Sequence, residues 1–193
     1  RVKVYWENGD AIAVSGASQP FITTLADPAP KAEFNGETVL ADKYYAVYPY
    51  EAVNEWADEV VSLTLPDVQE AVKGSFDPDV NIAVASTDDQ EKNFFFRNVT
   101  GLVKFTVGPA TGEITSVKVS ANGSEALAGD LLVDCSSDVP LAEPESAVSE
   151  VTLTSEDILA EGDYYIALLP GTYAEGLTFT LTGPDGTAEK RIE

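Results

Sequence analysis

The chain has 193 residues, of which 33 are acidic and 11 basic, giving a formal net charge of −22, and 44% are hydrophobic. That apolar fraction supports a folded core, while the charge excludes electrostatic binding to nucleic acid and argues against docking on anionic lipid. The absence of His and the presence of a single Cys exclude a Ser-His triad, a Cys-rich zinc site and an intrachain disulfide.

Alternation of apolar and polar residues with a period of two recurs along the chain and predicts β-strands. The predicted strands cover residues 2–6, 11–15, 31–34, 44–48, 60–65, 82–85, 93–96, 102–107, 114–120, 131–135, 148–153, 164–168 and 177–182. Turn sequences rich in Asn, Asp and Gly separate several of them. Strands at this spacing predict an all-β sandwich or barrel.

Two short segments have weak helical patterns. Residues 51–59 place Val53, Trp56 and Ala57 on one helical face, and residues 66–72 form a second candidate. Neither segment has the length of a stable independent helix.

No apolar run approaches the ~20 residues that span a bilayer. Because the chain contains no Met, we expect that a leader has been removed.

Two pairs of short motifs recur at a common offset of 120 residues. Gly9-Asp10 aligns with Gly129-Asp130, and Tyr44-Tyr45 aligns with Tyr164-Tyr165. The repeat predicts two β-domains, residues 1–88 and 89–193, joined within a polar stretch near residue 88. Two alternatives stay open: chance similarity between β-strands, and a loop inside one domain instead of a junction.

Comparison of the two halves predicts that each lacks a strand. Within the second half, two or three predicted strands precede Gly129, whereas within the first half only the strand 2–6 precedes Gly9. The second half, in turn, ends soon after the turn at 184–186. A sandwich without one of its strands has edges with unpaired N–H and C=O groups. Such an edge binds a strand from elsewhere or promotes aggregation.

No residue stands out as catalytic, cofactor-binding or metal-binding, and the chain is predicted not to be an enzyme. Cys135, in the apolar run 131–135, is interpreted as a small buried side chain and not as a nucleophile. The acidic pairs at 77–79 and 88–89 offer oxygen ligands for calcium, but solvated loop charge is the favoured reading. Among 33 acidic residues, no carboxylate pair is singled out for glycoside hydrolysis.

The aromatic residues are interpreted mainly as core. Trp56 is placed in a loop, where packing as a local lid is favoured over stacking on a sugar or anchoring a partner. Residues 94–96, three consecutive Phe, predict a strand buried on both faces or lying between domains. Five tyrosines lie on predicted strands, where alternation buries about half of them: Tyr44, Tyr45, Tyr48, Tyr164 and Tyr165.

Seven short motifs follow one another in an order that resembles a known family. They occupy residues 6–14, 32–36, 44–50, 65–69, 98–105, 126–130 and 164–170. In this order the chain resembles the fimbrillin-like family, the subunits and accessory proteins of type V pili of Gram-negative anaerobes. The resemblance covers nearly the whole chain.

The resemblance implies two transthyretin-like β-sandwich domains in tandem, export as a lipoprotein precursor, and assembly by β-strand addition after an N-terminal strand is removed. It implies a fimbrial structural or adhesin subunit at the cell surface, in the outer membrane or fimbrium. Other pilus subunits are then the partners, no cofactor is needed, and a lipid anchor outside this chain provides any membrane attachment. The chain departs from the family in showing neither a lipobox Cys nor a terminal donor strand.

Two other functions remain open. A non-polymerising surface lipoprotein would bind carbohydrate or another host ligand, including a host protein, through Trp56 or exposed tyrosines. A hydrolase would use a carboxylate pair, because glycosidase chemistry does not require His.

Overall fold

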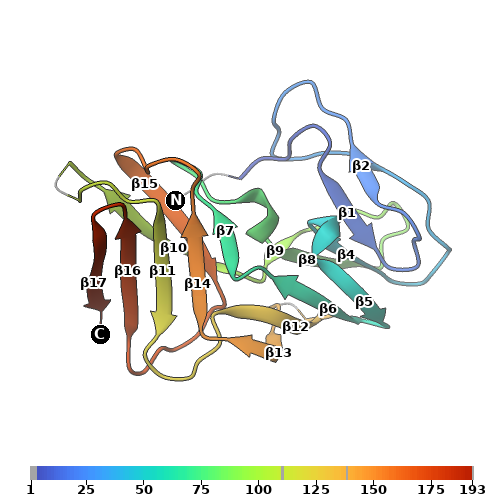
Figure 1. The fold of residues 1–193 in the computed structure, drawn as a ribbon. Helices are drawn as coiled ribbons and strands as arrows, with labels where there is room; N and C mark the ends of the chain where they lie inside the picture. Colours follow the sequence, from blue (N-terminus) through green and yellow to red (C-terminus); the bar gives the residue numbers. More distant parts are fainter. Residues whose placement is uncertain (1–3, 110, 138, 193) are drawn as a thin grey trace. The chain divides into compact units, whose positions relative to one another are not determined.

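The computed structural model describes residues 4–109, 111–137 and 139–192 (Figure 1). Within them the fold is all-β, as the sequence predicts, with two short 3-10 helices, η1 (Tyr50–Ala52) and η2 (Pro78–Val80), and no α-helix. No helix in this part of the chain is long and apolar enough to cross a membrane. The strands are β1 (Ala11–Val14), β2 (Phe21–Thr23), β3 (Phe34–Asn35), β4 (Tyr44–Tyr48), β5 (Val53–Ala57), β6 (Val60–Leu65), β7 (Val68–Glu70), β8 (Ala83–Thr87), β9 (Arg97–Asn98), β10 (Gly101–Val107), β11 (Ser116–Ala121), β12 (Ala128–Asp134), β13 (Ala142–Val148), β14 (Glu150–Thr154), β15 (Gly162–Leu168), β16 (Leu177–Gly183) and β17 (Gly186–Ile192).

The chain forms two compact units, each built from segments of both halves of the sequence. Unit 1 comprises Arg1–Leu63, Ile82–Val99 and Leu132–Glu143, and unit 2 comprises Thr64–Asn81, Thr100–Leu131 and Pro144–Glu193. The sequence-based division into 1–88 and 89–193 differs from this one. The reason is non-local pairing, because β7 joins β14 in a parallel ladder and thereby belongs to unit 2.

A six-stranded antiparallel sheet, with strand order β3-β2-β1-β4-β8-β9, lies in unit 1. Its core contains Ile12, Val14, Phe21, Tyr44 and Ala46. The alternating strand β4 directs Tyr44 and Ala46 to the same face, where both are fully buried. Burying a large apolar side chain contributes roughly 1.5–3 kcal/mol.

Two expectations for unit 1 need correction. Residues 93–96 do not form a strand, and Phe95 is 79% exposed although Phe94 and Phe96 pack against the core. The ladder with β8 begins only at Arg97, so the strand that pairs with β8 starts after the predicted strand 93–96 ends. Of the predicted strand 2–6, residues 2–3 lie outside the described residues, while Trp6 forms an isolated bridge with Ala29.

Both weak helix predictions are wrong. Residues 51–59 form the end of η1 and then β5, which pairs with β6 in a hairpin turned by Asp58 at φ 56°. The segment 66–72 contains β7, held by its ladder with β14. In both places hydrogen bonds to a partner strand override a weak helical preference.

The strands related by the 120-residue offset are buried alike but paired differently. Tyr44 and Tyr164 are 0% and 2% exposed, respectively. In unit 1, β1 and β4 pair with each other. At the offset positions, β15 pairs with β10, and β12 lies between β13 and β6. The repeat therefore marks similar strand chemistry without a shared pairing pattern.

Candidate functional site

A five-stranded sheet in unit 2 has one buried face, and its burial decreases from one edge to the other. The strand order is β17-β16-β11-β14-β7, antiparallel except for β7 with β14. One row of side chains crosses that face in register, one from each strand. From β7 to β17 this row contains Gln69, Leu153, Val117, Leu181 and Ala188.

The buried face is covered near β7 and uncovered near β17. Gln69, Leu153 and Val117 are at most 1% exposed, whereas Leu181 is half-buried. On β17 all seven residues are exposed, and Ile192 retains 49% of its accessible surface. Figure 1 shows β17 and β16 side by side at this edge of the sheet. Apolar area near β16 and β17 therefore lacks a full cover.

The covering sheet of unit 2 contains β10 and β15, paired over seven residues. β15 is the more deeply buried strand, and its Tyr164 and Ile166 are at most 2% exposed. The β10 residues paired with them, Phe105 and Val103, are only half-buried. β10 is therefore the strand of this pair that is less protected from solvent. Two strands alone also make a marginal sheet.

Gln69 occupies part of the side of β15 that faces away from β10. Its Oε1 accepts a hydrogen bond from the Ala167 backbone N–H at 2.9 Å, and its Nε2 donates to the Ala167 carbonyl at 2.8 Å. Nearby, the Gly74 N–H donates to the Asp163 carbonyl at 2.7 Å. The amide side chain thus takes both hydrogen bonds that a neighbouring strand would otherwise provide.

The opposite edge, along β10, remains open. Because Ala167 directs its N–H and C=O to Gln69, its pairing with Leu102 belongs to the non-hydrogen-bonded type. By alternation, the backbone groups of Leu102, Lys104 and Thr106 point away from β15. Within the described residues, no backbone hydrogen bond reaches these groups. This edge, together with the half-buried side chains Val103 and Phe105 on the inner face of β10, is called the β10 edge below.

The solvent-facing side chains of β10 are tied to β15. Lys104 Nζ lies 2.8 Å from Asp163 Oδ2, and the Thr106 hydroxyl donates to Asp163 Oδ1 at 2.7 Å. The hydrogen bond from Lys104 lowers the pKa of Asp163 and, reciprocally, raises the pKa of Lys104. These contacts keep β10 on β15 and leave its outer backbone groups untouched.

A second edge strand of unit 2, β17, is protected by charge. Its sequence includes Glu189, Lys190 and Arg191 in succession, and all three are exposed. Charged side chains on an edge strand discourage pairing with another chain. The sequence prediction contained no strand here, because residues 186–192 show no apolar alternation. β10 is therefore the better candidate for an acceptor edge.

The sequence-predicted chemical residues are dispersed, and local hydrogen bonds explain the acidic pairs. At 77–79, the Asp77 carboxylate accepts from the Glu70 N–H at 2.8 Å. At 88–89, Asp89 accepts from the Glu91 N–H at 2.9 Å, a bond that lowers its pKa. In the described part of the chain, no group of three or more His, Cys, Asp or Glu is arranged to hold a metal ion.

Cys135 is buried at 2% exposure, as expected, and burial raises the pKa of its thiol to about 12. A reactive free cysteine has a pKa near or below 8.5. In the folded protein we expect negligible alkylation by iodoacetamide at pH 8, and rapid alkylation in guanidinium. Mass spectrometry over time measures both rates. Equal rates with and without denaturant would contradict the burial of this thiol.

Comparisons with known proteins give a similarity to a solved structure. No family model matches the sequence, and no curated protein matches it. A solved structure from Bacteroides ovatus ATCC 8483, described as a "putative cell adhesion protein", superposes with a TM-score of 0.58 at 13% identity. The alignment covers 96% of this chain and 77% of that chain. At this identity the similarity shows a shared fold.

Proposed function

We propose that this chain is a structural or adhesive subunit of a bacterial surface fimbrium that joins other subunits by β-strand addition. The observation that carries the proposal is the β10 edge, with outward backbone groups at Leu102, Lys104 and Thr106. The inner-face side chains of the same strand, Val103 and Phe105, are only half-buried. The description of the Bacteroides ovatus neighbour as a cell adhesion protein and the resemblance to fimbrillin-like proteins support the same function.

An incoming strand would extend the β10–β15 pair to three strands. Its backbone would bond the outward groups of β10, each net hydrogen bond contributing about 0.5–1.5 kcal/mol. Alternate side chains would cover the half-buried Val103 and Phe105. On the other side of β15, Gln69 and Gly74 already bond the backbone groups of Ala167 and Asp163, so unit 2 would accept a strand at β10.

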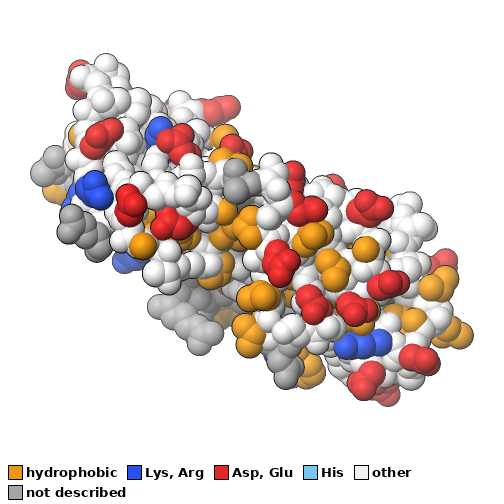
Figure 2. Space-filling model, turned by 90° about the horizontal axis from the view of Figure 1, so that it is seen from below, with side chains coloured by type: hydrophobic (Ala, Val, Ile, Leu, Met, Phe, Trp, Pro, Cys, Tyr) orange, Lys and Arg blue, Asp and Glu red, His pale blue; other side chains and the backbone are white. Residues whose placement is uncertain are grey.

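The partners on this proposal are other subunits of the same fibre, and the chain turns over no substrate. Figure 2 shows acidic side chains spread over the visible face with few basic ones among them. A net charge of −22 keeps subunits apart at long range. Assembly would therefore depend on the specific fit of a strand and not on electrostatic attraction.

Material sheared from the native cell surface provides the direct test. On unboiled electrophoresis, probed with an antibody to this chain, a strand-linked polymer gives a ladder of high-mass bands that collapses on boiling. A single band near 20.5 kDa would contradict assembly by strand addition.

Lys104→Pro is expected to abolish the ladder. Proline removes the outward N–H of this residue, while the hydrogen bonds from β10 to β15 come from the neighbouring positions, so the fold should survive. Lys104→Ala is the matched control, because it removes the ion pair with Asp163 but keeps the N–H. Unboiled electrophoresis of both variants should show the ladder only for alanine.

A second control tests whether removing an outward N–H from any exposed edge strand would also abolish the ladder. In the β16–β17 hairpin, Gly183 and Gly186 close a two-residue turn. The closing pair of such a turn is hydrogen-bonded, and hydrogen-bonded pairs alternate with non-hydrogen-bonded ones along the ladder. Glu189 belongs to a non-hydrogen-bonded pair, so its N–H points outward as well. Glu189→Pro should leave the ladder intact. Persistence of the ladder in folded Lys104→Pro, judged by thermal unfolding, would show that β10 is not the acceptor.

A further inference from the structure

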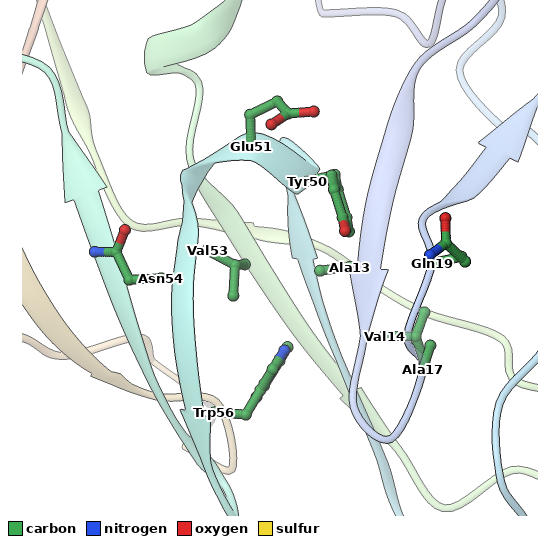
Figure 3. Close-up of a pocket in the computed structure, with 9 residues that line it drawn as sticks. All are labelled: Ala13, Val14, Ala17, Gln19, Tyr50, Glu51, Val53, Asn54 and Trp56. Carbon is green, nitrogen blue, oxygen red and sulfur yellow. The ribbon is translucent and has the colours of Figure 1, made fainter.

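A pocket of about 340 Å³ lies in unit 1, between the end of β1 and the segment η1–β5 (Figure 3). Buried side chains of β1 form its floor, aromatic and aliphatic side chains form its wall, and amides and a carboxylate lie at its rim. The lining residues are Ala13, Val14, Ala17, Gln19, Tyr50, Glu51, Val53, Asn54 and Trp56. Its volume falls in the range of small-molecule sites, about 300–1,000 Å³.

A β-bulge brings Trp56 to this pocket. In the β5–β6 ladder, Val53 pairs with Leu63 and Glu55 with Ser62, so Asn54 is the extra residue. In a regular strand, residues three apart point to opposite faces. The bulge restores Val53 and Trp56 to one face, and both line the pocket. Bulges commonly re-aim side chains beside functional sites.

Trp56 differs from the other tryptophan of the chain in its surroundings. Trp6 packs edge-on against Phe34, Tyr48 and Phe96, with ring centroids 5.0–5.4 Å apart. Trp56 is only partly buried, and no ring–ring contact is found for it in the described residues. Figure 3 shows its indole extending from β5 toward the space between β5 and β1. An aromatic face is therefore available to a ligand in the pocket.

The lining chemistry selects the class of ligand. An indole and a phenol ring offer faces for apolar C–H groups, while Gln19 and Glu51, both exposed, offer hydrogen bonds to hydroxyl groups. No Lys or Arg lines the pocket, and the chain carries a net charge of −22. Anionic ligands such as phosphates or sialylated sugars would be repelled.

We propose that this pocket binds a neutral saccharide, one sugar ring stacking on Trp56 while its hydroxyl groups bond Gln19 and Glu51. This site is separate from the β10 edge, and its function does not depend on polymerisation. It would give each subunit of a fibre its own contact with a glycan.

Fluorescence provides the test. In a Trp6→Phe variant, Trp56 is the sole tryptophan, so emission reports on the pocket alone. The probes are neutral oligosaccharides ending in galactose, glucose or an N-acetylhexosamine, each beside its sialylated counterpart. We expect a saturable change in emission with at least one neutral probe and at least tenfold weaker binding of its sialylated form.

Matched variants, measured by calorimetry in the full chain, locate the binding. Trp56→Ala should weaken saccharide binding at least tenfold, and Trp56→Phe, which keeps an aromatic ring, should weaken it less. Gln19 is exposed, so Gln19→Ala should weaken binding several-fold without affecting folding. Phe95→Ala is the control, since Phe95 is an exposed aromatic residue of the same unit outside the pocket.

Three results would overturn the proposal. The first is no response to any neutral probe at about 10 mM, a high concentration for a specific binding site. The others are equal binding of the sialylated and neutral probes, and unchanged saccharide affinity in folded Gln19→Ala and Trp56→Phe. The electrophoretic ladder should be unaffected in the Trp56 variants. The saccharide site and strand addition can therefore fail independently.

Discussion

Replacing Gln69 by leucine is expected to lower the free energy of unfolding by about 2–5 kcal/mol. Leucine is apolar and of similar size, so it fills the space but leaves the Ala167 N–H and C=O without partners. Both groups are now bonded by the Gln69 amide, which is 1% exposed. Each buried polar group left unsatisfied costs about 1–3 kcal/mol. Guanidinium unfolding followed by circular dichroism measures the difference.

Val68→Ala is the control for this substitution. Val68 is the preceding residue of β7 and is 58% exposed. Shortening it should change the free energy of unfolding by no more than about 0.5 kcal/mol. If Gln69→Leu and Val68→Ala have equal effects, the amide of Gln69 does not act as a substitute for a strand on β15.

Gly129→Ala should destabilise the protein by about 3 kcal/mol or more, through left-handed strain together with overpacking. Gly129 has φ 112°, a conformation unfavourable for residues with a side chain. A Cβ at this position would also overlap the Ser146 carbonyl oxygen and lie 3.1 Å from Val148 Cγ2. The carbonyl belongs to the backbone of β13, which cannot move without breaking its pairing. Thermal and guanidinium unfolding measure the loss.

Gly9 provides the matched comparison, because it precedes Asp10 as Gly129 precedes Asp130. It has φ 88°, but a Cβ added to it would meet no atom of a non-adjacent residue within 4 Å. Gly9→Ala should therefore cost only the conformational strain, about 1–2 kcal/mol. Equal losses at the two glycines would show that the approach of β13 to Gly129 does not constrain this position.

The sequence predicted the well-buried strands best. Clean alternation gave the bounds of β4 and β6 to the residue, and most of β10 and β15. It failed for β17, where every residue is exposed and the pattern carries no signal. It failed differently for β5, because the bulge at Asn54 puts Val53 and Trp56 on one face with a spacing of three, which resembles a helix.

The candidate sites depended on facts that local patterns do not contain. That a strand occupies 102–107 followed from alternation, but that it is an edge depends on the strand order, in which β10 pairs with β15 alone. Trp56 was singled out from its residue type and misplaced in a loop. Its position beside β1 is set by the β5–β6 ladder and its bulge.

The contact between Gln69 and Ala167 also has a consequence for the order of folding. Its partners are separated by 98 residues along the chain, and closing so long a loop is slow relative to local pairing. During synthesis, the segment Thr64–Asn81 emerges long before Pro144–Glu193, with which it shares unit 2. We expect unit 2 to fold only after nearly the whole chain has been made. Chaperone binding should then concentrate on the early apolar strand β6, which can pair at once with β5 but remains open on its other side until β12 has been synthesised.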